Sequence, residues 1–410
     1  MNWDHVKEIN DKLIPIAKGI KILSSISWPL SAEYEFISSL EEGRVKLPTI
    51  TYPKRDFNPE IKALDGLLKH WTAVHPVEVF LKKTIESYRD AARMLQAVGT
   101  QQFTKLSIEI FGTSSDIISQ KKISNLQVAK RFLRHERRFD HPYLKETEST
   151  VSAETIAEFL RNQIAALFQD VGPKVEISSS LAAKATANAQ VIRLREGTSY
   201  NTYDGQQLLV HEVLTHSLTA LNGQRQKFLS ILGFSAPRTV KTQEGLATYS
   251  EVITGSIDLR RLQRIALRII AIENALNGAS FVDTFRFFLE NGQSPKESFW
   301  SAARIFRGGF PNKNIVFTKD IVYLDGLMKV HALFRWVFMN QRLDLLHLLF
   351  CGRLTIEDLF PLEESYKTGI IDPPKFLPGW YTNIYGLAGS LSFLEVSHEI
   401  DKLHLEQEFM

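Results

Sequence analysis

The 410-residue sequence contains a single cysteine, Cys351. One thiol excludes an internal disulfide framework, a CxxC redox pair and a cysteine-rich metal site. The sequence also has no GxSxG turn of serine hydrolases, no phosphate-binding Walker loop and no GxGxxG dinucleotide motif. Serine-dependent hydrolysis, nucleotide hydrolysis and nicotinamide-dependent redox chemistry therefore have no supporting motif.

A strong charge excess and long apolar runs are absent as well. The net charge of +3 is too small to indicate nucleic-acid binding. The most apolar helical segment, 262–276, is interrupted by two arginines and a glutamate, and the first residues, MNWDHVKEINDKL, lack the apolar core of a signal peptide. We therefore expect a cytoplasmic protein, in keeping with its single thiol, that binds neither a membrane nor nucleic acid.

Two histidines lie inside a predicted helix. The segment HEVLTH occupies residues 211–216. Asp204 and Gln207 form a capping-box pair, so the helix is expected to begin near Gly205. Leucine and valine residues at helical spacing give this helix an apolar body. The histidines therefore belong to a helix rather than to a loop.

A second predicted helix follows in TQEGLATYSE, residues 242–251. Its first residue, a threonine, is a suitable N-cap, which places Glu244 in the first turn. Together with His211 and His216, this carboxylate gives the ligand set of a catalytic zinc site with one open position. Glu212, next to the first histidine, is the natural base for a water molecule at that position.

The histidines are five residues apart, whereas the common HExxH motif of zinc peptidases has them four apart. At about 100° per residue, this spacing separates the two side chains by about 140° on a regular α-helix. They can share one metal ion only if the helix is locally widened, and a π-bulge has this effect. We therefore expect a widened or bent helix between them. In a straight helix they would be unrelated residues of one amphipathic segment.

These motifs and several flanking blocks resemble a known family. HEVLTH followed by TQEGLA is similar to the QEGLA-motif proteins, described as flavohaemoglobin expression-modulating, whose relatives include the microtubule-associated tyrosine carboxypeptidases. SSISWPLSAEYEFISSL and VGTQQFTKLSIEIFG upstream, and RIFRGG and FTKDIVYLDG downstream, resemble further blocks of that family. The resemblance implies a zinc-dependent peptidase that binds one Zn²⁺ through His211, His216 and Glu244 and uses Glu212 as catalytic base. Glu251, two turns beyond Glu244, is an alternative ligand or a partner of a ligand.

The predicted fold is α+β and mostly helical, with a gluzincin-like zinc peptidase core made of the HExxxH helix and the second ligand helix. The best strand candidates are 174–179 and 190–195. The second is either a simple edge strand or a strand that pairs with the substrate backbone. The length favours an N-terminal helical region, 1–120, and a catalytic domain with a C-terminal helical subdomain, 121–410.

A carboxypeptidase must recognise a terminal carboxylate, and burying that charge unpaired would cost several kcal/mol. A cation is therefore required near the metal. Arg307, just before Gly308-Gly309, and Lys319 are the candidates; the alternative is that they pair with Asp320 or Asp325 in a structural network. Candidates for stabilising the tetrahedral oxyanion are Tyr200, Tyr249 and Tyr323.

The sequence thus predicts a zinc metallopeptidase, and most simply a carboxypeptidase that releases a C-terminal residue, with tyrosine suggested by the resemblance, from a peptide or protein. An endopeptidase, an aminopeptidase and a non-catalytic regulatory protein that keeps the metal for structure are the alternatives. Glu212 argues against the last, because a structural site closes its fourth position and needs no base. The basic segment 121–138 is either a docking patch for an acidic partner or a solvated helix face.

Overall fold

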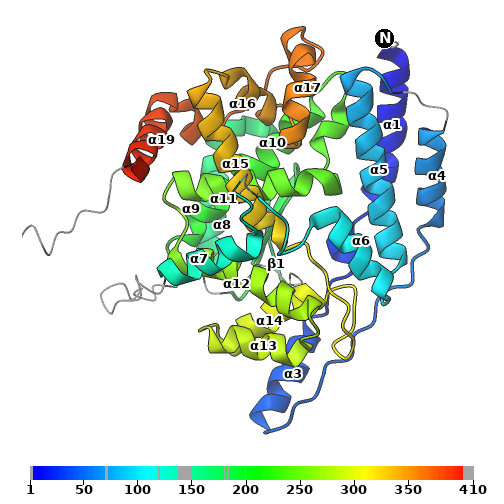
Figure 1. The fold of residues 1–410 in the computed structure, drawn as a ribbon, viewed down its shortest axis with the longest axis vertical. Helices are drawn as coiled ribbons and strands as arrows, with labels where there is room; N and C mark the ends of the chain where they lie inside the picture. The colour runs from blue at the N-terminus through cyan, green and yellow to red at the C-terminus, as the bar shows by residue number, and fades with distance from the viewer. Residues whose placement is uncertain are drawn as a thin grey trace, which may run out of the picture.

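The computed structural model describes residues 3–69, 73–118, 121–136, 150–179, 181, 184–198 and 200–399. Most of this chain is helical, and its strands form one small sheet (Figure 1). The predicted class, α+β and mostly helical, is therefore confirmed. None of the described helices is long and apolar enough to cross a membrane. Of the basic segment, Arg137 and Arg138 lie outside the described residues.

Several helices precede the sheet along the chain. They are α1 (Trp3–Gly19), α2 (Ile22–Ser25), α3 (Ser31–Glu41), α4 (Asn58–Leu68), α5 (Pro76–Gln96), α6 (Gln101–Phe111), α7 (Asn125–Glu136) and α8 (Ala153–Phe168). At the start of α5, His75 Nδ1 accepts a hydrogen bond from the Val77 N–H, and Glu78 accepts one from the His75 N–H. This capping box, with Pro76 as first helical residue, fixes where α5 begins. Helices α1, α4 and α5 pack side by side (Figure 1).

The sheet consists of β1 (Lys174–Ser178), β2 (Ala185–Ala187) and β3 (Val191–Arg195) in the order β1-β3-β2. β3 pairs in parallel with β1 and antiparallel with β2. The two predicted strands are therefore present, but the second, β3, is the central strand and has no free edge. The edge strand on its other side is β2, whose three residues are too few to show an alternating pattern.

After the sheet the described chain is helical again. A continuous rod is formed by α9 (Asp204–Leu208), the π-helix η3 (Leu209–Ser217) and α10 (Leu218–Gln224). The next helices are α11 (Val240–Ile253), α12 (Leu259–Leu276), α13 (Phe281–Glu290) and α14 (Pro295–Phe306). The last are α15 (Ile321–Met339), α16 (Leu343–Phe350), α17 (Ile356–Lys367), α18 (Gly379–Thr382) and α19 (Ile384–Glu399). Short 3₁₀ turns lie at Gln169–Val171, Ser230–Gly233 and Pro237–Thr239.

Two predicted helix caps are wrong. Asp204 and Gln207 do not form a capping box; instead the Asn201 side chain accepts hydrogen bonds from the N–H groups of Tyr203 and Asp204. The helix that carries Glu244 begins at Val240, upstream of its predicted N-cap threonine, because the 3₁₀ turn before it continues directly into α11. Glu244 therefore lies beyond the first turn of that helix.

Two hydrophobic clusters hold the described chain together. In the first, Leu13 of α1 is buried together with Val213 of η3 and Val330 of α15. The second gathers around α12, α13 and α14 and includes Phe36 of α3 and Leu324 of α15. Each such side chain contributes about 1.5–3 kcal/mol relative to leaving it exposed. Because α15 contributes to both clusters, it connects the two parts of the core. The predicted division near residue 120 stays a prediction.

Helices α11 and α15 are in backbone contact at two glycines. A Cβ atom on Gly245 would lie 2.3 Å from the carbonyl carbon of Gly326, and a Cβ atom on Gly326 would lie 2.1 Å from the carbonyl oxygen of Lys241. Side chains are excluded at both positions, because such contacts are far inside van der Waals distance. The close approach brings Glu244 on α11 next to the segment that leads into α15.

Candidate functional site

Both histidines of the HEVLTH segment lie in the π-helix η3. A π-helix closes its hydrogen bonds between residues five apart, so residues at that spacing lie on nearly the same face. The His211 and His216 rings accordingly approach to 5.0 Å between centroids at 84° to each other. The widening that the spacing predicts is therefore present.

Side-chain donors satisfy carbonyl groups of the π-helix. Thr215 Oγ1 donates to the Val210 carbonyl at 2.9 Å, and Ser250 Oγ of α11 donates to the same oxygen at 3.2 Å. The carbonyl of His216 accepts from Arg353 Nη2 at 3.1 Å. Because an unpaired buried carbonyl is costly, these donors stabilise the widened geometry.

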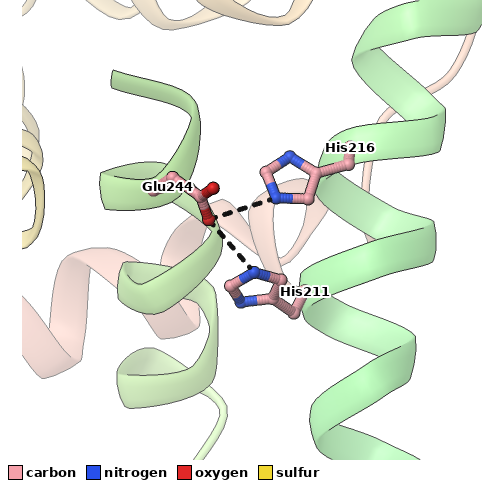
Figure 2. Close-up of side chains that lie close together, drawn as sticks. All are labelled: His211, His216 and Glu244. Atoms are coloured by element: carbon pink, nitrogen blue, oxygen red, sulfur yellow. Dashed lines mark ion pairs between the residues drawn. The ribbon is translucent and has the colours of Figure 1, made fainter. Parts of the chain in front are cut away.

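Glu244 faces both histidines from α11 (Figure 2). Its Oε2 atom lies 3.5 Å from His211 Nε2 and 3.5 Å from His216 Nε2. The three ligand atoms lie within 4.8 Å of one another. Tetrahedral coordination with bonds of about 2.1 Å places ligand atoms about 3.4 Å apart, so the spacing fits a zinc-sized ion.

Glu251 holds the His211 ring from the side opposite Glu244. His211 Nδ1 lies 2.6 Å from Glu251 Oε1, and Arg261 donates to both oxygens of that fully buried carboxylate at 2.9 Å. Burial raises the pKa of Glu251, but Arg261 and His211 outweigh it and bring that pKa to about 2. The carboxylate therefore accepts from Nδ1 and leaves Nε2 to face Glu244, which makes Glu251 a partner of a candidate ligand rather than a ligand.

The charges around His211 favour its protonated form in the metal-free protein. Burial lowers the pKa of His211, but hydrogen bonds to Glu244 and Glu251 outweigh burial and raise it to about 10. Metal binding at Nε2 would therefore displace a proton.

Glu212 lies beside the three clustered side chains without belonging to them. It lines the same pocket and is partly exposed. The described residues offer it no ion pair. A carboxylate in this position is free to accept a proton from a molecule in the pocket.

The pocket has a volume of about 400 Å³, and both histidines line it. Its walls come from η3 and α11, from the edge strand β2, from the segment 20–23 and from the residues around α14 and α15. Cationic side chains outnumber the two carboxylates of its lining, Glu212 and Glu244. The cationic residues are Lys21, Arg304, Arg307, Lys319 and Arg353.

The two predicted cations both line this pocket, but only Lys319 forms an ion pair there. Lys319 Nζ donates to Glu244 Oε1 at 2.9 Å, and the Glu244 charge raises the Lys319 pKa against burial. Arg307 is only 8% exposed, and its Nε atom has no hydrogen-bond partner. Burial, then the neighbouring Arg304 charge, lowers the Arg307 pKa to about 10.

The carboxylates offered as alternative partners for these cations are taken by other residues. Asp320 accepts two hydrogen bonds of 2.7 Å from Arg304. Asp325 lies 2.6 Å from Lys241 Nζ. The structural-network alternative therefore does not account for Arg307, which has no ion pair among the described residues.

Of the three candidate tyrosines, Tyr323 lines the pocket, 5.0 Å from Lys319 Nζ to its ring centre. Tyr200 instead donates to the carbonyls of Lys184 and Arg195, and neither it nor Tyr249 lines the pocket. Tyr249 packs in the core against aromatic side chains. An oxyanion role for Tyr200 or Tyr249 therefore has no geometric support.

Of the pocket residues that were not identified from the sequence, three have polar side chains beside the candidate centre. They are Tyr88, Gln243 and Arg353. Tyr88 lies among apolar positions of α5, where the sequence pattern predicts a core aromatic residue. Arg353 lies in the loop after α16, in a segment without a recognisable motif. Gln243 Oε1 accepts from Thr219 at 2.9 Å while its buried Nε2 has no partner. The only sequence signal for Gln243 is its position directly before Glu244.

Comparison with known proteins gives one informative match. The sequence model of the family described as microtubule-associated tyrosine carboxypeptidase matches residues 35–399, which is most of the chain. The matched range contains η3, α11 and the cationic residues of α14 and the following loops, whereas segment 20–23 lies before it. No curated protein matches the sequence.

Proposed function

The chain belongs to the microtubule-associated tyrosine carboxypeptidase family, and we propose that it is a zinc-dependent carboxypeptidase that removes the C-terminal residue of a peptide or protein. The observation that carries this proposal is the convergence of His211, His216 and Glu244 in the lining of a pocket rich in cations. The family description suggests tyrosine as the released residue. A gluzincin-like core and a cytoplasmic location complete the proposal.

The donor set suits zinc. Two imidazole nitrogens and one carboxylate oxygen leave a fourth position open, as in catalytic zinc sites. Glu244 divides its oxygens, with Oε2 toward the histidines and Oε1 bound by Lys319. Lys319 therefore orients this carboxylate for binding through one oxygen. A bound zinc ion would act as a Lewis acid, polarising the scissile carbonyl and making water acidic enough to attack at neutral pH.

Glu212 supplies the proton transfers of the hydrolysis. It takes a proton from the attacking water as the water oxygen bonds to the carbonyl carbon and the carbonyl electron pair moves onto oxygen. That pair re-forms the carbonyl as the carbon–nitrogen bond breaks, and Glu212 gives its proton to the leaving nitrogen. The proton of the new carboxyl group then passes to the amine, so the products are a carboxylate and an ammonium group.

The proposal is tested on purified protein by metal analysis and by mass spectrometry of a peptide library. We expect one zinc per chain and the loss of a single C-terminal residue. Internal cleavage would favour the endopeptidase, and loss from the amino terminus the aminopeptidase. Absence of hydrolysis by zinc-loaded protein would favour a non-catalytic metal-binding protein.

Arg307 is the proposed partner of the substrate's terminal carboxylate, because its buried guanidinium has no ion pair among the described residues. Peptides with a free carboxy terminus are expected to have a kcat/KM about 10²-fold or more above that of matched amidated peptides, since a buried cation would otherwise stay unpaired. Arg307→Met should remove this preference. The exposed Arg286 offers a control: Arg286→Met should retain the preference. Equal cleavage of both peptides by the wild type would contradict a carboxypeptidase.

Glu251→Gln is expected to weaken zinc binding about 10–100-fold, the usual effect of losing the partner of a metal-binding histidine. The variant also leaves Arg261 buried without its carboxylate, so some loss of stability is expected. The zinc Kd is measured by competition with a chelating dye well below the unfolding temperature. Arg261→Gln serves as the control, because it removes the arginine but keeps the carboxylate on His211 Nδ1. An unchanged Kd for Glu251→Gln would show that Glu251 does not position His211.

A further inference from the structure

Arg353 is a buried cation beside the candidate metal centre. Its side chain lines the pocket and the residue is 9% exposed. Nη2 donates to the carbonyl of His216 at 3.1 Å, while Nε is buried without a partner. Arg353 forms no ion pair with a carboxylate of the described residues. Burying a charge without a counter-charge is unfavourable, so the arrangement requires a compensating role.

Three partly buried arginines of this protein do have a carboxylate partner. Arg261 binds Glu251, Arg304 binds Asp320 and Arg238 binds Asp358, each through two hydrogen bonds. Those pairs are complete without a ligand. Arg307 and Arg353 differ, because each keeps donor capacity inside the pocket for an anion that comes from outside.

The position of Arg353 is fixed by its surroundings. Its N–H donates to the Leu232 carbonyl at 2.7 Å, and a Cβ atom on the preceding Gly352 would lie 2.7 Å from Leu232 Cβ. The guanidinium is bound to the backbone of His216 itself. The group is therefore held in place before substrate binds, which is the condition for electrostatic stabilisation of a transition state.

Arg353 and Arg307 have different charged neighbours. The charged groups that influence Arg353 include Glu244 and Glu212, the candidate ligand and base. For Arg307 they include Arg304 and Asp320. A carboxypeptidase must bind two anionic groups: the terminal carboxylate, present throughout, and the oxyanion, present only after water has attacked.

We propose that Arg353 stabilises the oxyanion of the tetrahedral intermediate, while Arg307 binds the terminal carboxylate. This inference rests on the proposed peptidase function. When the water oxygen bonds to the carbonyl carbon, the electron pair displaced onto the carbonyl oxygen faces the guanidinium. As that pair returns and the carbon–nitrogen bond breaks, the interaction weakens again. Arg353 thus contributes most where the charge is greatest.

The test is Arg353→Gln, which keeps an amide donor for the His216 carbonyl and removes the charge. We expect kcat to fall by about 10²–10³, the usual effect of losing an oxyanion donor, with KM changed only a few-fold. A phosphinic peptide, whose tetrahedral anion resembles the intermediate, should bind to the zinc-loaded variant more weakly by a similar factor. Zinc content and Tm should match the wild type. Arg307→Met should instead raise KM and remove the preference for a free carboxy terminus.

Several outcomes would overturn the assignment. Wild-type kcat and phosphinic-peptide affinity in Arg353→Gln would exclude the role, and a rise in KM with lost free-terminus preference would make Arg353 the carboxylate partner. Loss of zinc, with activity restored by added zinc, would reduce Arg353 to a support for η3. If the wild-type protein hydrolyses no peptide, the proposed function itself fails. That result is seen with the wild type alone and is therefore distinct from a failure of the Arg353 assignment. Arg353→Lys, which keeps the charge, should restore part of kcat.

Discussion

Glu212→Gln is expected to lower kcat by about 10²–10⁴, the range for losing a general base, while the protein keeps its metal. Glutamine has nearly the same shape as glutamate but cannot accept the proton of the attacking water. Glu212 is not one of the three clustered ligand atoms and has no ion pair among the described residues, so neither metal content nor fold should depend on its charge. Steady-state kinetics measure kcat, metal analysis measures the zinc content, and the Tm reports the stability of the fold.

A matched control for this variant is Glu290→Gln. Glu290 is exposed at the end of α13 and does not line the pocket. Its substitution should leave kcat, zinc content and Tm unchanged. If Glu212→Gln hydrolysed peptides at the wild-type rate, the proton would have to go to another group, and the role of Glu212 would be lost.

Removing the metal is the second change with a large expected effect. Incubation with a strong chelator should abolish hydrolysis, and added zinc should restore it. His216→Ala should be inactive and remain so after zinc addition, because two of three ligands do not hold the ion. A metal ion at a free concentration of 100 times its Kd stabilises the folded state by about 2.7 kcal/mol. Chelation should therefore also lower the Tm of the wild type.

His135→Ala is the control for the histidine variant. His135 is exposed on α7 and is not part of the pocket. It should respond to chelator and zinc as the wild type does. Full activity of wild-type protein after complete removal of metal would show that hydrolysis does not depend on the ion.

The clustered side chains were predictable because they come from two short segments close together in the sequence. The five-residue spacing of the histidines required a widened helix, and η3 has that geometry. The helix ends were less predictable, since caps compete with nearby turns. Asn201 replaces the expected capping box, and a 3₁₀ turn extends α11 in front of its expected first residue.

Residues brought to the pocket by tertiary packing were not predictable in the same way. Arg353 reaches the pocket from a loop after α16, and Tyr88 from the apolar face of α5. Neither has a sequence neighbour with site chemistry. The edge strand β2 was missed because Ala-Thr-Ala carries no strand signal, and its pairing with β3 depends on the rest of the sheet.

The contact between Gly245 and Gly326 limits how this centre could be transplanted. A designer who copied the histidines, Glu244 and Lys319 onto another pair of helices would also have to copy the absence of two side chains. With alanine at either position the helix axes would have to separate, and Glu244 would leave the coordination distance, for which the tolerance is about 0.2 Å. Such a design would therefore have to copy a helix pair of fixed spacing, and it needs the two glycines as much as the proposed ligands.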